Sequence, residues 1–268
     1  MLTDIAPAFL LSMTISGLAY WRGSLSRSGV LGAVVVGTLT FGFGGWLWGG
    51  LLGIFFVSSS LLSHFKESDK RQAAEKFDKG HQRDIGQALA NGGVGAVVAL
   101  LSVLLPWPGW FPLFIGIMAT VNADTWATEL GTLSKSPPRL VTTGRVVEVG
   151  TSGGVSPLGT LVSLLGGLVI GLPAGLFSAD LPILAASLMG GLGGLAGSLC
   201  DSLLGATVQQ IYYCDHCQKD TERKIHKCGH QTRSLRGWSW LNNDLVNLIS
   251  SLFGGLVALA VWRALQAG

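Results

Sequence analysis

Four polar segments of the chain place carboxylates or amides inside apolar stretches or at their ends. A carboxylate at mid-membrane depth costs about 2.5–3.5 kcal/mol, so such acids usually face the interior of a helix bundle and serve an ion or a substrate. We therefore expect the four segments to assemble one site. They are Val121–Gly131 with Asp124 and Glu129, the stretch 193–206 with Asp201 and Ser202, Asn242-Asn243-Asp244 with Asn247, and Asn91 shortly after Arg83.

The acids favour a hard divalent cation. Mg²⁺ takes oxygen ligands and is commonly held by one or two carboxylates together with substrate phosphates. We expect Asp124, Asp201 and Asp244 to bind one or two Mg²⁺ ions and to be catalytic. Glu129, offset from Asp124 by about 140° around a helix, is the fourth catalytic candidate, with a metal-binding or positioning role. The simpler alternative places these acids in the headgroup layer at helix ends.

A loop of small residues, Thr151–Thr160, runs into an apolar segment and is the candidate phosphate cradle. Ser156 is a good N-cap and Pro157 a good first helical residue, so free backbone N–H groups would lie at this helix start. A plain re-entrant turn is the alternative. Arginines would balance negative charge, and asparagines would orient the ligands. The candidate substrate- or phosphate-binding residues are Arg83, Asn91, Asn122, Arg139, Arg145, Ser152, Gly153, Gly154, Ser156, Ser202, Asn243 and Asn247.

The polar segment 212–236 holds a second kind of site. Cys214-Asp215-His216-Cys217 is followed by Cys228-Gly229-His230, which gives the spacing C-x2-C-x10-C-x-H. Three thiolates and an imidazole match the ligands of tetrahedral zinc. Free thiols are the alternative, because C-x-H is tighter than the usual second half of a zinc site. We predict a structural zinc ion bound by Cys214, Cys217, Cys228 and His230, with His216 and His226 as reserve ligands.

The composition places the whole chain in a membrane. Its 268 residues have a mean hydropathy of +0.50, and only 12% of them are charged, whereas soluble domains carry roughly 25%. The 39 glycines indicate closely packed transmembrane helices, because small residues let helix backbones approach. The net charge of +3 gives no basis for nucleic-acid binding. We expect a single integral membrane domain over residues 1–268, with the Cys/His-rich loop 212–236 within it.

The expected fold class is all-α, a polytopic bundle of about eight transmembrane helices. A crossing of the hydrocarbon core needs roughly 17–25 apolar residues. The boundary between the second and third spans falls in a glycine-rich stretch and is the least defined. The expected spans are Ile5–Tyr20, Gly29–Trp46, Leu51–Phe65, Ile85–Leu105, Trp110–Leu130, Pro157–Leu172, Ile183–Ile211 and Leu241–Arg263.

The basic residues predict the orientation, because cytoplasmic loops carry an excess of Lys and Arg. With eight spans, all of the 18 basic residues except Arg263 fall in alternate loops. One of these loops, Lys66–Asp84, could bring Lys79 or Arg83 to a phosphate. We expect a multi-pass protein of the cell membrane with both termini outside and a site that opens to the cytoplasm. The pattern leaves open whether the protein is an oligomer.

Taken together, four of these motifs resemble a family of multi-spanning membrane proteins that includes plant phytyl-phosphate kinase and the animal transmembrane protein 19 group. The resemblance implies phosphoryl transfer from a nucleoside triphosphate, CTP in the phytyl case, to an isoprenoid monophosphate. The chain is more distantly similar to membrane polyprenol kinases and cytidylyltransferases. Its Cys-rich loop departs from the plant and animal members and resembles microbial relatives. The matching stretches are Asn122–Gly131, Thr151–Thr160, Gly197–Ala206 and Asn242–Asn247.

These features favour a Mg²⁺-dependent kinase that converts a prenyl or polyprenyl, phytyl-like monophosphate to the diphosphate at the cytoplasmic membrane face, with CTP as the favoured donor. Its partners would be the nucleotide, the isoprenoid monophosphate and the membrane lipids. Two other classes fit the polar clusters. A membrane cytidylyltransferase would attach CMP to a lipid phosphate and release pyrophosphate, and an ion-coupled transporter would also place acids and broken helices inside a bundle.

Overall fold

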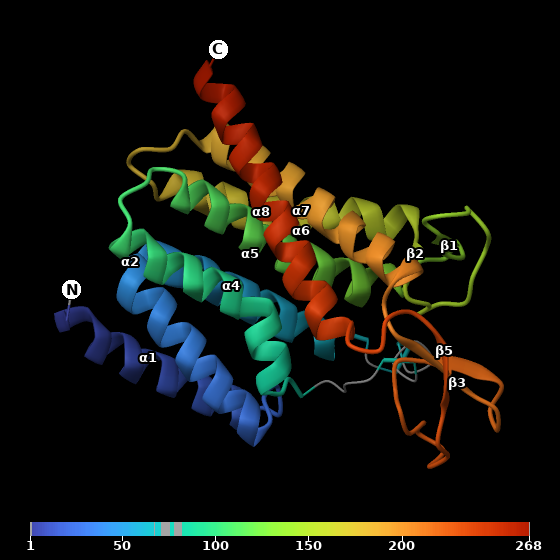
Figure 1. Ribbon diagram of the computed structural model, residues 1–268. Helices are drawn as coiled ribbons and strands as arrows, with labels where there is room; N and C mark the ends of the chain where they lie inside the picture. Colours follow the sequence, from blue (N-terminus) through green and yellow to red (C-terminus); the bar gives the residue numbers. More distant parts are fainter. Residues whose placement is uncertain (1, 67, 71–75, 78–81, 268) are drawn as a thin grey trace.

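The protein is a bundle of long helices with two small sheets at one end, seen in a computed structural model that describes residues 2–66, 68–70, 76–77 and 82–267 (Figure 1). The expected all-α membrane bundle is confirmed, although the polar segments contain short strands. The helices are α1 Leu2–Trp21, α2 Arg27–His64, α4 Ile85–Leu104, α5 Trp110–Gly131, α6 Pro157–Leu176, α7 Ile183–Thr207 and α8 Asn243–Ala267. The strands are β1 Arg139–Leu140, β2 Gly154–Val155, β3 Ile211–Cys214, β4 Lys219–Thr221 and β5 Arg233–Arg236.

Both sheets are antiparallel and lie in the polar segments. β1 pairs with β2, and the second sheet has the order β4-β3-β5. In β1–β2, Arg139 lies opposite Val155, and in the second sheet Cys214 lies opposite Lys219. The Cys/His-rich segment is therefore a small sheet rather than an irregular loop.

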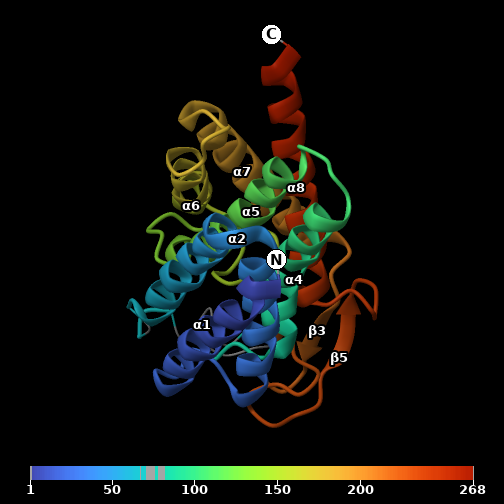
Figure 2. The same ribbon diagram turned by 90° about the vertical axis from the view of Figure 1, so that its left-hand side faces the viewer.

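Helix α5 forms the centre of the bundle. Its residues from Pro112 to Ala123 are all buried, and it packs against α4, α6, α7 and α8. Figure 2 shows α5 enclosed between α2, α7 and α8. A helix that is apolar on all sides can face lipid or lie inside a bundle, and the packing of its neighbours gives α5 the inner position. Phe114, Ile117 and Met118 belong to the main core. Asp124 is the residue directly after the buried part of α5.

Five of the described helices are long and apolar enough to cross a membrane, namely α2, α4, α6, α7 and α8. The shorter apolar segment Ile5–Trp21 lies within α1. Helix α5 carries Asn122, Asp124 and Glu129, which lower its mean hydropathy, but its neighbours enclose it. The membrane character predicted from the composition is thus confirmed.

Helix α2 reverses direction at Gly45, where φ is +80° and ψ is −173°. A straight helix of 38 residues would be about 57 Å long. Both ends of α2 nevertheless contact Arg83: Ser26 N, just before the helix, donates to Arg83 O at 3.0 Å, and Arg83 Nη1 donates to Ser60 Oγ at 3.2 Å. The described chain therefore passes through the bundle eight times, and the second and third expected spans are the two arms of α2.

This alternation brings the polar segments to one end of the bundle. The turns around Gly45, between α4 and α5, and between α6 and α7 lie at the other end. In Figure 1, both labelled chain ends lie away from the sheets. The four polar segments singled out in the sequence consequently meet beside the sheets, as expected for one site.

Glycines allow α6 and α7 to pack backbone to backbone. A Cβ atom added to Gly190 would lie 2.6 Å from Gly167 O and 2.6 Å from the Cα atom of Gly171. Backbone atoms cannot move aside as a flexible side chain can. This close approach is typical of membrane helices, which associate through packing rather than through the hydrophobic effect.

We expect Gly190→Val to lower the free energy of unfolding by at least about 1–3 kcal/mol. The valine side chain has no space between α6 and α7 and would push the two helix backbones apart. The measurement is the thermal unfolding midpoint in detergent. Gly53→Val is the matched control, since a Cβ atom at Gly53 of α2 meets nothing within 4 Å. Equal midpoints for the two variants would contradict the assignment of this seam.

Candidate functional site

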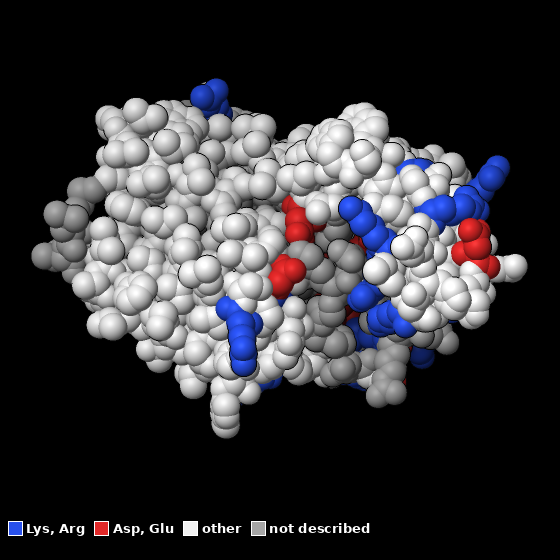
Figure 3. Space-filling view, turned by 60° about the horizontal axis from the view of Figure 1, so that its bottom comes forward, with Lys and Arg blue, Asp and Glu red and all other residues white. Residues whose placement is uncertain are grey.

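A cavity of about 670 Å³ opens where the polar segments meet. Its walls come from α4 to α8, from the loop before α6 and from the segment around β3 and β4. On this face, Figure 3 shows acidic side chains near the centre and basic side chains beside them on the side of the sheets. The candidates that line the cavity are Arg83, Asn91, Asp124, Glu129, Ser152, Gly153, Gly154, Ser156, Asp201, Ser202, Asn243, Asp244 and Asn247.

Two carboxylates lie near one another on the packed helices α5 and α7. Asp124 Oδ1 accepts a hydrogen bond from Ser198 Oγ at 3.3 Å, and Asp201 Oδ2 accepts one from Ser250 Oγ at 3.1 Å. The two carboxylates are close enough to repel each other electrostatically. Like charges at such a separation favour a cation between them. The pair is therefore a suitable place for a divalent metal ion.

Helix α8 contributes a third acid from its first turn. Asn242 precedes the helix, and its Oδ1 accepts a hydrogen bond from Leu245 N at 3.1 Å, so this asparagine caps the helix. Asp244, Asn243 and Asn247 line the cavity from the same helix start. The three acids thus come from α5, α7 and α8, which pack against one another and fix the relative positions of the carboxylates.

The loop before α6 forms another wall of the cavity. The predicted cap is confirmed: Ser156 Oγ accepts a hydrogen bond from Gly159 N at 3.1 Å, and Pro157 begins the helix. Gly153 has φ +85° and lies so close to the backbone of Ala206 that no side chain fits. Only glycine combines this φ with this contact at low cost. The small residues of the loop therefore let it pack directly against α7.

Arg83 brings a partly buried cation to the cavity. Its Nη1 donates to Ser60 Oγ at 3.2 Å, and its guanidinium lies 5.6 Å from the ring centroid of Phe55 and 5.7 Å from that of Phe56. Burial lowers the pKa of Arg83 to about 10, while the charge of Glu129 raises it, so the group stays charged at neutral pH. Its remaining N–H donors suit a phosphate. Lys79, the other predicted cation of this loop, lies outside the described residues.

Three predicted substrate contacts lie outside the cavity lining. Asn122 is fully buried: its Nδ2 donates to Gly166 O at 2.7 Å, and its Oδ1 accepts from Ser58 Oγ at 2.9 Å. This amide joins α5 to α6 and α2 and has a packing role. Arg139 and Arg145 are exposed on and beside β1. Residue type and proximity in sequence suggested these contacts, but the folded chain directs the three side chains elsewhere.

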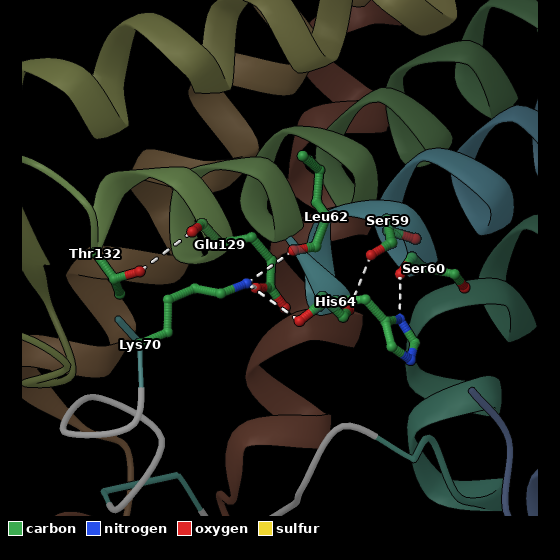
Figure 4. A network of polar contacts seen from close by, with 8 residues as sticks. Ser59, Ser60, Leu62, His64, Lys70, Glu129 and Thr132 are labelled. Carbon is green, nitrogen blue, oxygen red and sulfur yellow. Dashed lines mark hydrogen bonds and ion pairs between the residues drawn. The ribbon is translucent and has the colours of Figure 1, made fainter. Parts of the chain in front are cut away.

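Glu129 forms an ion pair with Lys70, a residue that the sequence analysis did not single out (Figure 4). Lys70 Nζ also donates to Leu62 O at 2.7 Å and to Ser63 O at 3.2 Å. A cation at the last carbonyls of a helix is favourable. The Lys70 side chain is buried, and the Glu129 side chain is 19% exposed. Of the two roles expected for Glu129, positioning fits better, because its carboxylate holds the loop and the end of α2 against α5.

We expect Lys70→Met to lower the free energy of unfolding by about 1–3 kcal/mol, because the partly buried Glu129 carboxylate loses its ion-pair partner. The double variant Lys70→Met/Glu129→Gln should recover part of this loss, since no uncompensated charge remains. Thermal unfolding in detergent measures both effects. Lys66→Met, on an exposed lysine, is the control. Strict additivity in the double variant would show that the ion pair contributes no coupling energy.

Further cavity residues come from the segment between Cys217 and Cys228. Glu222, Arg223, Lys224 and Lys227 all line the cavity. Glu222 Oε1 accepts hydrogen bonds from Ser152 Oγ at 3.0 Å and from Gln209 Nε2 at 2.8 Å. The available signal was three basic residues within five positions. In the sequence these basic residues indicated the membrane orientation and were not assigned to the cavity.

The cysteines and histidines gather in two overlapping groups. Cys214, Cys217, His226 and Cys228 form one group, and His216, Cys228 and His230 form the other. The Cys/His cluster predicted from the spacing is therefore present and could hold a metal. Its fourth member is His226, a reserve ligand in the sequence analysis, in place of His230. His230 instead stacks on His216 with ring centroids 4.1 Å apart. Spacing alone could not distinguish these imidazoles, because the strand pairing decides which one turns inward.

The chain matches the family model described as "Integral membrane protein DUF92" over residues 10–255. Protein PGR of Arabidopsis thaliana is 35% identical over 270 residues and 91% of each chain. An uncharacterized membrane protein of Methanocaldococcus jannaschii is 34% identical, over 90% of this chain and 87% of its own. Protein VTE6, chloroplastic, of Arabidopsis thaliana is 27% identical, over 88% of this chain and 64% of its own. No solved structure matches the chain.

Proposed function

The chain belongs to the integral membrane protein family DUF92, and from this premise we propose that it is a kinase for an isoprenoid monophosphate. The phosphoryl donor is a nucleoside triphosphate, with CTP favoured, and the acceptor is a prenyl or polyprenyl, phytyl-like monophosphate. The similarity to Protein VTE6 and the motif resemblance to plant phytyl-phosphate kinase support this class of reaction. The observation that carries the proposal is one cavity that combines three helix-borne aspartates with basic side chains.

The acidic part of the cavity suits Mg²⁺. Asp124, Asp201 and Asp244 offer hard oxygen ligands from three packed helices, and the first two repel each other electrostatically. When bound there, Mg²⁺ would neutralise phosphate charge that develops during transfer. Ser198 and Ser250 orient the Asp124 and Asp201 carboxylates by hydrogen bonds. This arrangement positions oxygen ligands before the substrate arrives.

Phosphoryl transfer requires mainly positioning and charge neutralisation. An oxygen of the acceptor phosphate forms a bond to the γ-phosphorus of the donor, the bond from that phosphorus to the β,γ-bridging oxygen breaks, and the products are the nucleoside diphosphate and the lipid diphosphate. The acceptor oxygen is already anionic, so it needs no general base. Arg83 is placed to bind phosphate oxygens, and the isoprenoid tail would remain among the helices.

The site opens at the end of the bundle that carries the basic loops. By the distribution of Lys and Arg, this end faces the cytoplasm, and both termini lie on the other side of the cell membrane. A cytoplasmic opening would give the site access to nucleotides. A lipid acceptor explains why the cavity lies at the ends of membrane helices. The phosphate head of the lipid needs polar surroundings, and its isoprenoid tail needs apolar ones.

The test is to incubate the purified protein in detergent with Mg²⁺, one of CTP, ATP, GTP and UTP, and a panel of prenyl monophosphates. The expected product has gained one phosphate, with the nucleoside diphosphate released, and mass spectrometry reads both. A lipid that carries a CMP moiety, with pyrophosphate released, would replace the kinase by a cytidylyltransferase. Absence of product with every pair, together with solute flux in proteoliposomes without nucleotide, would replace it by a transporter.

A further inference from the structure

We propose that Cys214, Cys217, His226 and Cys228 bind one zinc-type metal ion, and that this ion holds the segment 222–227 at the cavity so that its basic side chains contact substrate phosphates. The first half concerns a metal site separate from the aspartates. The second half rests on the proposed function, because it assigns phosphate contacts to that cavity. Bound metal tests the first half, and phosphate binding tests the second.

The ligand atoms have the spacing of a tetrahedral site. All four lie within 4.8 Å of one another. Cys214 Sγ and Cys228 Sγ are 3.7 Å apart, and His226 Nδ1 lies 3.1 Å from Cys228 Sγ. Zinc–sulfur bonds of 2.3 Å place the thiolates of a tetrahedral site about 3.8 Å apart. Three thiolates and one imidazole select zinc over hard cations such as Mg²⁺.

The two histidines differ in their surroundings. His226 is buried, as is Cys214, whereas His216 and His230 are exposed and stack on each other. The backbone also orients His226, whose N–H donates to His230 O at 3.0 Å. His226 therefore joins Cys214 as a buried member of the ligand set. His230 lies on the outer side of Cys228.

Among the described residues of the small sheet and its loops, Ile211 is the one large apolar side chain that is buried. Its strands β3, β4 and β5 have four, three and four residues. Ile225 is 60% exposed and Leu235 is 45% exposed, so these large apolar side chains contribute little burial. Units below about 40 residues usually need a metal, disulfides or a partner to fold. A bound ion would supply that missing stabilisation from inside the sheet.

The segment 222–227 connects the metal group to the cavity. At one end, Glu222 accepts hydrogen bonds from Ser152 and Gln209 of the bundle. At the other end, His226 belongs to the ligand set. Between and beside these anchors, Arg223, Lys224 and Lys227 line the cavity.

A segment fixed at both ends can present its cations at a constant position. The helices supply carboxylates that suit the metal ion of a metal-bound polyphosphate. The segment 222–227 supplies cations that suit its phosphate oxygens. The structure therefore gives the metal-held sheet a binding role in addition to a structural one.

The first experiment measures bound zinc per chain in protein purified in detergent. We expect about one ion in the unchanged protein and a loss of it in His226→Ala and Cys217→Ser, since each removes one of the four ligands. His230→Ala and Cys200→Ser are the matched controls and should retain it. Cobalt substitution should show tetrahedral thiolate absorption in the unchanged protein and in the controls, but not in His226→Ala or Cys217→Ser. Retention in His226→Ala with loss in His230→Ala would overturn the ligand assignment.

The second experiment follows trypsin cleavage after Arg223, Lys224 and Lys227. Removing zinc should accelerate cleavage there by at least about tenfold, because the segment loses one anchor and opens locally. Cleavage after Lys135 serves as the internal control and should not change. Equal cleavage rates in the loaded protein and in His226→Ala would overturn the claim that the ion holds the segment.

The third experiment measures the binding of inorganic triphosphate with Mg²⁺ by calorimetry, which does not depend on turnover. His226→Ala should weaken binding by at least about tenfold, the factor expected when one charge-assisted hydrogen bond is lost, whereas His230→Ala should not. Unchanged affinity would overturn the phosphate-binding half. If no lipid product forms with the unchanged protein but these shifts are seen, the kinase assignment fails and the metal-held binding segment stands.

Discussion

Asp201→Asn is expected to reduce turnover by at least about 100-fold. Mutation of a residue that only hydrogen-bonds to a metal ligand typically costs 10- to 100-fold in activity, and loss of a ligand itself should cost at least as much. The substitution keeps the shape of the side chain and its hydrogen bond from Ser250, but it removes a negative charge beside Asp124. Asp124→Asn and Asp244→Asn should have effects of the same order. Initial rates of lipid diphosphate formation measure the loss.

Titration with Mg²⁺ separates a metal role from a general structural one. If the aspartates hold the ion, the residual activity of each variant should require more Mg²⁺ for half-saturation, because fewer anionic ligands remain. Asp180→Asn is the matched control, since Asp180 is exposed in the turn between α6 and α7. Near-normal rates for all three cavity variants would refute the site assignment.

The second large effect is expected for Arg83. Arg83→Gln should lower kcat/KM by about 10- to 100-fold, the range that corresponds to one charged hydrogen bond of roughly 1.5–3 kcal/mol. Arg83→Lys keeps the charge but loses the planar, bidentate guanidinium group. Its kcat/KM should therefore lie between those of the unchanged protein and of Arg83→Gln. Kinetics with varied nucleotide and varied lipid show which phosphate the guanidinium contacts.

Arg145→Gln is the control for this prediction. Arg145 was a candidate in the sequence analysis, but the structure leaves it exposed outside the cavity. We expect its kinetic constants to stay within about twofold, the usual range for a surface charge. A larger loss for Arg145→Gln than for Arg83→Gln would mean that the exposed turn, and not the cavity, binds phosphate. Unfolding midpoints of both variants exclude a folding defect.

Much of the fold follows from composition and periodicity alone. Long apolar segments must become helices in a membrane, because every backbone polar group needs an internal partner. The glycine pair at 44–45 marked an uncertain boundary, and the structure turns α2 back at Gly45. The small strands were not expected, since two- to four-residue strands depend on pairing with distant segments.

Charge placement was the most informative feature of the site in the sequence. An acid inside an apolar helix has few stable uses, so residue type and position alone predicted that Asp124, Asp201 and the cluster around Asp244 would lie together, and all three line one cavity. The Cys/His cluster followed from its spacing in the same way. Roles that depend on direction could not be derived: Asn122 points into a helix seam, and Arg145 points to solvent.

Composition and charge placement already predict a membrane bundle in which acids, small residues and arginines from distant segments share one end, because alternating spans bring those segments together. Which side chains meet depends on how the helices and the sheets pack. The packing pairs Lys70 with Glu129, groups His226 with three cysteines, and brings Arg223 to the cavity. These contacts join residues far apart in the chain or depend on strand register, and the packing of helices and sheet sets both.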